Sequence, residues 1–260
     1  MKPIFIFLCV ISSFAYAQET ISTIKIDSNP FKAKSIASID NFGTIYYSRK
    51  DNWYIKKTID TTLTYSNIQL GAISTSDAFN PLKINLFYKD FNTIVILDNR
   101  LAEIFKVDFN LIQDYKNVTF VSTGFDNSVW VFNQDLQQLE LFNYKTLTTK
   151  IKTIPIQDDV LDLKSDYNSA WLLTTKYLYV YNYFGSLIAK IENSGFESIA
   201  LDHGNLVLKK EKSLYFLEKN KTIPKLIYSS ELLINQFLLT NESLYIYDGE
   251  MLHHFQLKTD

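Results

Sequence analysis

Three histidines are the first residues to consider for metal chemistry. His253 and His254 are adjacent, and neighbouring residues of a strand point to opposite faces, so the two are badly placed to share one ion. His203 lies between Asp202 and Gly204, a sequence typical of a turn. A zinc site needs a third ligand at a regular spacing, and the chain offers none. We therefore expect these histidines to lie in turns or at the surface.

Four aspartates lie close together in one segment, at positions 158, 159, 162 and 166. Their spacing differs from the alternating ligands and central glycine of a calcium-binding loop. In an extended strand, however, Asp162 and Asp166 would share one side. These two are therefore the candidate ligands if a divalent cation such as calcium is bound. The interpretation that we favour is solvated carboxylates, with no cofactor and no metal.

Nucleophilic catalysis has little support in the sequence. The G-x-S-x-G motif is absent, and no Ser/His/Asp order stands out. Seven glycines form neither a dinucleotide-binding motif nor a phosphate-binding loop. We predict no catalytic residues, and the sequence favours a protein that is not an enzyme.

The N-terminus has the pattern of an export signal. Lys2 is followed by a mostly apolar segment, residues 3–14, and by Ala-Tyr-Ala at 15–17, a small-x-small cleavage site. We predict a signal peptide over residues 1–17 and a mature chain that begins at Gln18. The apolar run is too short for a transmembrane span. A lipid anchor on Cys9 is the less favoured alternative, because only about six apolar residues precede this cysteine.

These features predict an exported protein that is periplasmic or associated with the cell envelope. Cys9 is the single cysteine, so the mature chain would fold without disulfides. The net charge is −2, and the basic residues are mostly scattered lysines. Nucleic-acid binding needs a basic face, so we do not expect it.

Short apolar runs recur along the rest of the chain and predict an all-β fold. From residue 21 on, runs of five to eight residues are separated by breaks rich in Asn and Asp. The expected strands fall into six groups of four: 35–40, 44–48, 53–59, 63–69; 82–88, 93–97, 101–107, 111–115; 118–122, 128–132, 138–142, 148–154; 160–164, 170–174, 177–181, 186–191; 198–201, 205–208, 213–217, 225–228; and 231–236, 237–239, 243–247, 251–257.

The groups repeat every 36–43 residues, which is the size of a β-propeller blade. The expected third strands are alike: Leu-Glu-Leu-Phe-Asn at 139–143, Leu-Tyr-Val-Tyr-Asn at 178–182, Leu-Tyr-Phe-Leu-Glu at 214–218 and Leu-Tyr-Ile-Tyr-Asp at 244–248. We predict one domain over residues 18–260, a β-propeller of six four-stranded blades. Residues 20–27 form an extra alternating strand that we expect to join the last blade and close the ring.

The Leu-Tyr-x-Tyr-Asn/Asp strands, followed by Phe184-Gly185-Ser186 or Gly249-Glu250-Met251, resemble exported bacterial propellers with NHL, PQQ or YVTN repeats. The chain also resembles small secreted propeller proteins of the Bacteroidota. The resemblance implies a toroid with loops on two faces and a central channel. It implies no single chemistry. Six-bladed lactonase-like hydrolases hold a cation in the channel, and a metal-dependent hydrolase of this type is the alternative function.

Aromatic residues make up 15% of the chain. We expect the regular tyrosines of the third strands to pack between blades. Five phenylalanines fall in expected turns and would form a contact patch if they share one face: Phe79, Phe91, Phe125, Phe184 and Phe196. The leading hypothesis is a monomeric, non-enzymatic scaffold or adaptor that binds another envelope or secreted protein.

Overall fold

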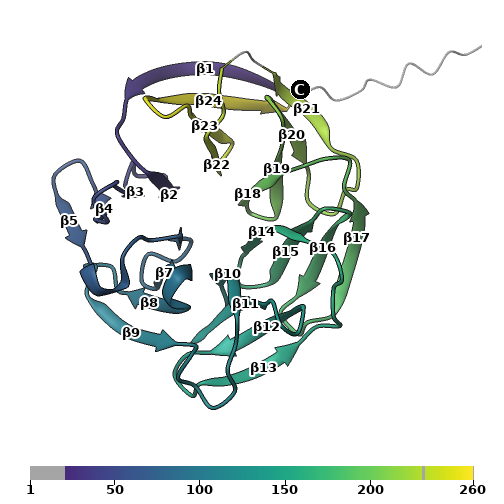
Figure 1. The fold of residues 1–260 in the computed structure, drawn as a ribbon. Coiled ribbons are helices and arrows are strands. Elements are labelled where there is room, and N and C mark those ends of the chain that lie inside the picture. The colour runs from purple at the N-terminus through teal and green to yellow at the C-terminus, as the bar shows by residue number, and fades with distance from the viewer. Residues whose placement is uncertain (1–20, 230–231, 260) are drawn as a thin grey trace, which may run out of the picture.

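A computed structural model describes residues 21–229 and 232–259 of the chain. Six sheets, each of four antiparallel strands, stand around a common centre (Figure 1). This arrangement confirms the expected six-bladed β-propeller. The predicted signal peptide over residues 1–17 lies outside the described residues, and so does Gln18.

The chain builds the blades in order, and each blade begins at the centre of the ring and ends at its rim. Blade 1 contains β2 (Ser35–Ile39), β3 (Ile45–Ser48), β4 (Tyr54–Lys57) and β5 (Thr62–Tyr65); blade 2 contains β6 (Thr75–Asp77), β7 (Ile84–Tyr88), β8 (Thr93–Leu97) and β9 (Glu103–Asp108); blade 3 contains β10 (Val118–Thr123), β11 (Ser128–Asn133), β12 (Gln138–Asn143) and β13 (Thr148–Lys152).

The second half of the ring follows the same plan. Blade 4 contains β14 (Val160–Ser165), β15 (Ser169–Thr174), β16 (Tyr177–Asn182) and β17 (Leu187–Glu192); blade 5 contains β18 (Ser198–Asp202), β19 (Asn205–Lys210), β20 (Ser213–Leu217) and β21 (Lys225–Ser229); blade 6 contains β22 (Gln236–Thr240), β23 (Ser243–Tyr247), β24 (Met251–Thr259) and β1 (Ile21–Pro30). Two short 3₁₀ helices, η1 (Ile68–Leu70) and η2 (Lys89–Phe91), lie in connections.

The hydrophobic core lies between blades. Side chains alternate along a strand, and in β11 Val129 and Val131 pack in a cluster shared with blade 2, whereas Trp130 and Phe132 pack in a cluster shared with blade 4. In the described part of the chain there are six such clusters, and each joins two neighbouring blades. A blade therefore buries its apolar faces only in the presence of its two neighbours.

The N-terminal strand closes the ring, as expected. β1 pairs with β24 along its length, so the first and last described strands lie together in blade 6 (Figure 1). The structure corrects the composition of that blade. β1 is its fourth strand rather than an additional one, and the expected strand at 231–236 is not formed by the described residues 232–235. The Leu-Tyr strand at 244–248 is consequently a second strand and not a third.

A second correction concerns blade 2. Residues 111–115 do not form a strand, since the amide of Leu111 donates to the carbonyl oxygen of Asp108 in a turn. The strand that completes the sheet is instead β6, which is three residues long and is the first and innermost strand of the blade. Its sequence, Thr-Ser-Asp, has no apolar alternation, and this is why the pattern of the chain did not predict a strand there.

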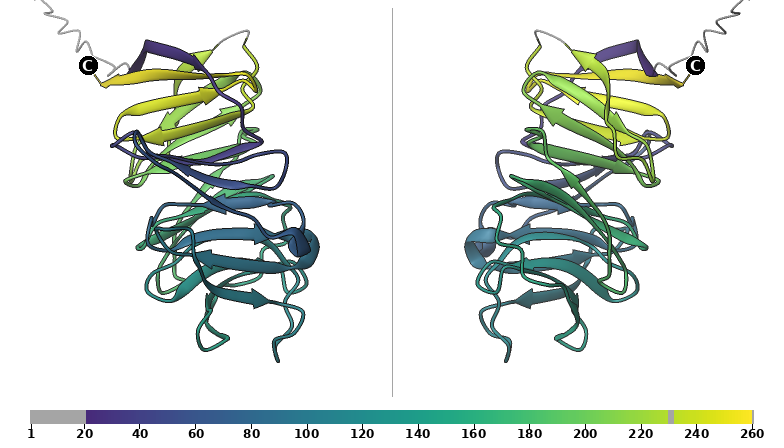
Figure 2. Two further views of the ribbon diagram at one scale, coloured as in Figure 1. Left: turned by 90° about the vertical axis from the view of Figure 1, so that its left-hand side faces the viewer. Right: turned by 90° about the vertical axis from the view of Figure 1, so that its right-hand side faces the viewer.

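The strands run across the thickness of the disc, so their connections gather on two faces (Figure 2). We call one the hairpin face, where the inner strand of each blade turns into the second strand. The inner strands end together there: Asp77 accepts from the Thr123 amide at 2.8 Å, and Thr240 donates to the Ile39 carbonyl at 2.8 Å. The crossover face is the opposite one, where the chain passes from one blade to the next.

Candidate binding face and central channel

A cavity of about 460 Å³ occupies the centre of the ring. All six inner strands, or the residues that directly follow them, contribute to its wall. The charged members of this wall are Asp40, Asp77, Lys164 and Asp202, and its other titratable members are Tyr46 and His203. Phe79 and Pro81 belong to the wall as well and lie in the connection between β6 and β7, so the cavity reaches the hairpin face.

The aspartates of the inner strands hold neighbouring blades together. In each case a carboxylate oxygen accepts a backbone N–H from the inner strand of the next blade or from the residue that follows it. The three pairs are Asp77 to Thr123 at 2.8 Å, Asp162 to Ile199 at 2.9 Å, and Asp202 to Asn241 at 2.8 Å. Gln236 serves the same purpose between blades 6 and 1, where its side-chain oxygen accepts from the amide of Ile36 at 2.8 Å. We call these contacts the inter-blade latches.

The two candidate metal ligands are both occupied by backbone donors. Asp162 accepts from the amides of Leu163 and Ile199 with its two different oxygens. Asp166 follows β14 and accepts from the amides of Asn168 and Ser169, at 2.7 Å each. Across residues 21–229 and 232–259, no three His, Cys, Asp or Glu side chains come together in a way that could hold a metal ion. The structure thus gives both carboxylates a role in turns and latches.

Five aromatic side chains from blades 2, 3 and 4 lie on the hairpin face in two contacting groups, which together we call the aromatic patch. Phe79 contacts Tyr167 edge to face, with ring centroids 5.2 Å apart. Phe125 contacts Tyr183 at 5.7 Å, and Tyr183 contacts Phe184 at 4.0 Å. Four of the five expose more than a third of their surface, and Phe184 is 65% exposed. Exposed aromatic groups of this kind are typical of binding surfaces.

The connection that carries Phe125 has a tightly determined backbone. A Cβ on Gly124 would lie 2.8 Å from the carbonyl oxygen of Ser128, so the close approach of the two chain segments requires glycine. Asp126 has a φ of 49°, a left-handed conformation that Asp tolerates better than most residues. The hydroxyl of Ser128 donates to the carbonyl of Phe125. These constraints fix the direction in which Phe125 leaves the blade.

A buried lysine lies beneath the patch. The ammonium group of Lys83 donates to the carbonyl oxygens of Gly124, Asp126 and Ser128 at 2.5 to 3.1 Å. The same nitrogen lies 6.0 Å from the centre of the Tyr167 ring. Burial lowers the pKa of Lys83 to about 8, although the charges of Asp77 and Asp126 oppose the shift. Lys83 therefore joins the β6–β7 loop of blade 2 to the β10–β11 loop of blade 3, beneath the aromatic rings.

The structure separates the five phenylalanines that fall in expected turns. Phe79, Phe125 and Phe184 share the hairpin face. Phe91 ends η2 between β7 and β8, so it lies on the crossover face. Phe196 is 6% exposed and packs on Tyr215 in the core between blades 4 and 5. The expectation of a single patch of five is therefore corrected to three of them, joined by two tyrosines.

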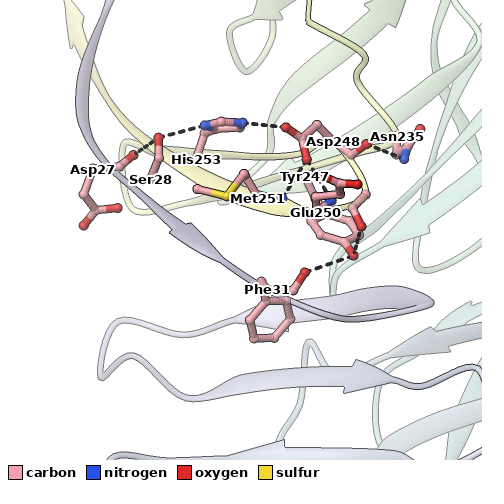
Figure 3. A network of polar contacts seen from close by, with 10 residues as sticks. Asp27, Ser28, Phe31, Asn235, Tyr247, Asp248, Glu250, Met251 and His253 are labelled. Atoms are coloured by element: carbon pink, nitrogen blue, oxygen red, sulfur yellow. Dashed lines mark hydrogen bonds and ion pairs between the residues drawn. The ribbon is translucent and has the colours of Figure 1, made fainter.

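A Ser–His–Asp chain of contacts lies in the seam that closes the ring (Figure 3). The Ser28 hydroxyl is 2.8 Å from Nδ1 of His253, and Nε2 of His253 is 3.0 Å from an Asp248 oxygen. The Ser28 hydroxyl is also 2.8 Å from the carbonyl oxygen of Asp27. His253 is buried, and none of these residues belongs to the wall of the central cavity. The arrangement ties β1 to β24 and to the turn that begins at Asp248.

The histidines were expected in turns or at the surface, and His253 differs because it is buried. His203 lies in its expected turn with a φ of 50° and pairs with Asp202 at 2.9 Å. His254 is half-buried and stacks on Tyr245. His253 is buried, and its two ring nitrogens contact Ser28 and Asp248. Sequence alone did not reveal its partners, since Ser28 lies 225 positions away.

Two patch residues and two lysines escaped the sequence analysis. Tyr167 and Tyr183 lie in the breaks between expected strands, which is the same signal that identified the phenylalanines. Lys83 and Lys164 carry no signal in the sequence, because a lysine in a connection or strand is ordinarily solvated. Their burial arises from the neighbouring blade.

No helix in the described part of the chain has the length and apolar character that a membrane crossing requires.

The architecture resembles several solved structures at low sequence identity. A streptogramin B lyase matches at 10% identity and a TM-score of 0.62, over 85% of this chain and 78% of that one. A chain of a mitotic checkpoint complex matches at 11% identity and 0.63, over 87% and 74%. The WD40 domain of Toxoplasma gondii coronin matches at 9% identity and 0.61, over 93% and 87%. At these identities the likeness concerns the fold alone. No protein family and no curated protein matches the sequence.

Proposed function

We propose that this protein is a non-enzymatic exported propeller that binds another protein of the cell envelope through the aromatic patch on its hairpin face. The observation that carries the proposal is the patch itself: five aromatic rings from three blades form a contacting pair and a contacting group of three, and four of the five remain exposed. Aromatic side chains supply much of the energy of protein interfaces, because they bury a large area with few rotatable bonds.

The patch is also held in place before any partner binds. Its members leave short connections of the rigid ring, and Lys83 fixes the connection that carries Phe125 through three carbonyl contacts. A preorganised surface loses little conformational entropy on binding, so more of the contact energy is available as affinity.

Export is supported by the N-terminal sequence. The charged, apolar and small-residue segments of residues 1–17 match a signal peptide, and the mature chain would carry no cysteine. Mass spectrometry of the protein from its native cells tests this point. An N-terminus at Gln18 in an envelope fraction is the expected result, and a full-length chain in the cytoplasm would contradict it.

The test of the binding surface compares two faces of the same molecule. Tagged mature protein is cross-linked in native envelopes, the stoichiometric partner is identified and purified, and its affinity is measured by titration. We expect Phe79→Ala combined with Phe184→Ala to weaken binding by at least about tenfold, since each interface aromatic contributes on the order of 1 kcal/mol or more.

Phe91→Ala is the matched control, because Phe91 is 47% exposed on the crossover face and Phe79 is 43% exposed on the hairpin face. This variant should bind within about twofold of the wild type. Equal loss in both variants would overturn the assignment of the face. The metal content of the same purified protein addresses the alternative: a stoichiometric divalent cation that Asp162→Asn releases would favour a channel hydrolase.

A further inference from the structure

Lys164 is a charged group of the central cavity that has no partner. It is the fifth residue of β14, belongs to the cavity wall and is half-buried. Within residues 21–229 and 232–259 its ammonium group makes no hydrogen bond and no ion pair. A lysine that is partly removed from water gains from an anionic partner more than a fully exposed lysine does.

The carboxylates of the same wall are already engaged. Asp40 accepts from the amides of Phe42 and Thr44 within its own turn, and Asp77 and Asp202 form inter-blade latches. His203 pairs with Asp202 at 2.9 Å. Asp162 and Asp166, which flank Lys164 in sequence, are held by backbone amides as described above. Within the described residues none of these carboxylates contacts the ammonium group of Lys164, so it remains available to a ligand.

We propose that the central cavity is a binding site for a carboxylate-bearing ligand, with Lys164 as the ion-pair partner of the carboxylate. The cavity volume of about 460 Å³ lies within the range of small-molecule pockets, about 300–1,000 Å³. Ser38, Ser76 and Ser122 line the same wall, and Phe79 adds an aromatic residue at the hairpin face. A ligand with a carboxylate and an aromatic or apolar group therefore matches the wall.

Such a carboxylate has two sources: a free small molecule, or an acidic side chain of a segment that enters from the hairpin face. The site shares Phe79 with the aromatic patch, but Lys164 is not part of that patch, so Lys164 variants test the site separately from the protein partner proposed above. The probes are 3-phenylpropionate and its uncharged analogue 3-phenylpropionamide, together with a terminally blocked peptide that ends in Phe-Glu and its Phe-Gln counterpart. Binding to the mature protein is measured by ligand-observed NMR titration.

The wild type should bind each carboxylate probe at least about tenfold more tightly than its amide. Lys164→Gln should abolish this preference, and Lys164→Arg should retain most of it, because arginine keeps the charge. Lys106→Gln is the control, since it removes the same charge from an exposed position on the outer strand β9 and should leave the preference intact. Thermal unfolding of each variant verifies that the ring is folded.

Two results would overturn the proposal. One is equal binding of carboxylate and amide by the wild type. The other is the same loss of preference in Lys106→Gln as in Lys164→Gln, which would indicate a general charge effect. Binding of 3-phenylpropionate but not of the peptide supports a small-molecule site, and tighter binding of the Phe-Glu peptide supports a partner segment. Either result leaves Phe184→Ala, which lies outside the cavity wall, to test the protein partner separately.

Discussion

At the scale of single residues, the ring contains a fully buried ion pair between Lys116 and Glu140. Lys116 lies in the connection between blades 2 and 3 and contacts Glu140 of β12 at 2.5 Å, with both side chains at most 2% exposed. The Thr149 hydroxyl donates to the same carboxylate oxygen as Lys116, and the Asn133 amide donates to the other oxygen. Burial acts to raise the pKa of Glu140, but these three hydrogen-bond donors outweigh it and lower the pKa.

Breaking this pair on one side should destabilise the protein strongly. Lys116→Met leaves a buried carboxylate without its counter-charge, and we expect the free energy of unfolding to fall by about 3–5 kcal/mol. Chemical denaturation measures it. The double variant Lys116→Met with Glu140→Leu removes both charges and should recover most of the loss. A double variant as unstable as the single one would contradict this account.

The pair also predicts an acid limit to stability. The pKa of Glu140 is lower in the folded state, so the unfolded chain binds more protons below the ordinary value of 4.5. The contribution of the pair is therefore complete above pH 4.5 and declines as the pH falls through the folded-state pKa. Denaturation curves of the wild type and the double variant should converge as the pH is lowered from 5 toward 3.

Lys83 predicts a pH dependence of the same sign at the alkaline end. Its folded pKa is about 8 and its ordinary value is 10.5, so the unfolded chain holds more protons between these values. The free energy of unfolding should rise with pH across this window, by up to about 3 kcal/mol. The other lysines and the tyrosines also titrate above pH 9, so the measured quantity is the difference between the wild type and Lys83→Met. A pH-independent difference would show that Lys83 has an ordinary pKa.

At the scale of elements, the inter-blade latches explain why carboxylates recur in the inner strands. Asp162 resembles a metal ligand in the sequence, yet it accepts two backbone amides, one from its own strand and one from β18. We expect Asp162→Ala to lower the free energy of unfolding by about 1–3 kcal/mol, because a buried amide loses its acceptor. The metal content of the purified protein should not change.

Asp166→Ala is the natural comparison, since Asp166 accepts only within its own turn and latches no neighbouring blade. Its effect on stability should be the smaller of the two. A larger loss in Asp166→Ala, or a cation lost from either variant, would contradict the structural role of Asp162.

Most of the elements could be predicted from the sequence because apolar runs alternate with Asn and Asp turns in every blade. β6 escaped detection since a three-residue polar strand leaves no apolar period. The error had a consequence for the site. If the blade began at residue 82, the turn at Phe91 would join its first and second strands and lie on the hairpin face. Because β7 is in fact the second strand, this turn joins the second and third strands and lies on the crossover face. Local pattern identifies a turn, but the face on which it lies depends on the strand order of the whole blade.

The candidate site was predicted in part for the same reason. Phe79, Phe125 and Phe184 could be found because aromatic residues in turns are unusual. Phe196 follows the same pattern but is covered by Tyr215 of the next blade, a contact that depends on the packing of separate repeats. The burial of Lys83 and the isolation of Lys164 likewise depend on neighbouring blades, so no local signal reveals them.

At the scale of the whole molecule, stability depends on closure of the ring, because every core cluster is shared by two blades. Deletion of residues 21–30 removes β1, the Ser28–His253 contact and the backbone pairing of β24. We expect this variant to lose cooperative unfolding and to self-associate through the uncovered edge of β24. Light scattering and thermal denaturation measure both effects.

The single substitution Ser28→Ala provides the milder comparison. It removes one contact of the seam and keeps β1, so the protein should remain monomeric with a loss of about 0.5–1.5 kcal/mol. If the deletion variant stayed monomeric with cooperative unfolding, the ring would not require its closing strand.

Closure by the two ends of the chain also places a condition on the time course of synthesis. Ser28 and His253 are 225 positions apart, and translation proceeds at roughly 5–20 residues per second. β1 is therefore made about 10–45 seconds before β24, the strand with which it pairs. Throughout that interval β1 has no partner strand, and an unpaired strand edge of this kind is a form that a chaperone can recognise.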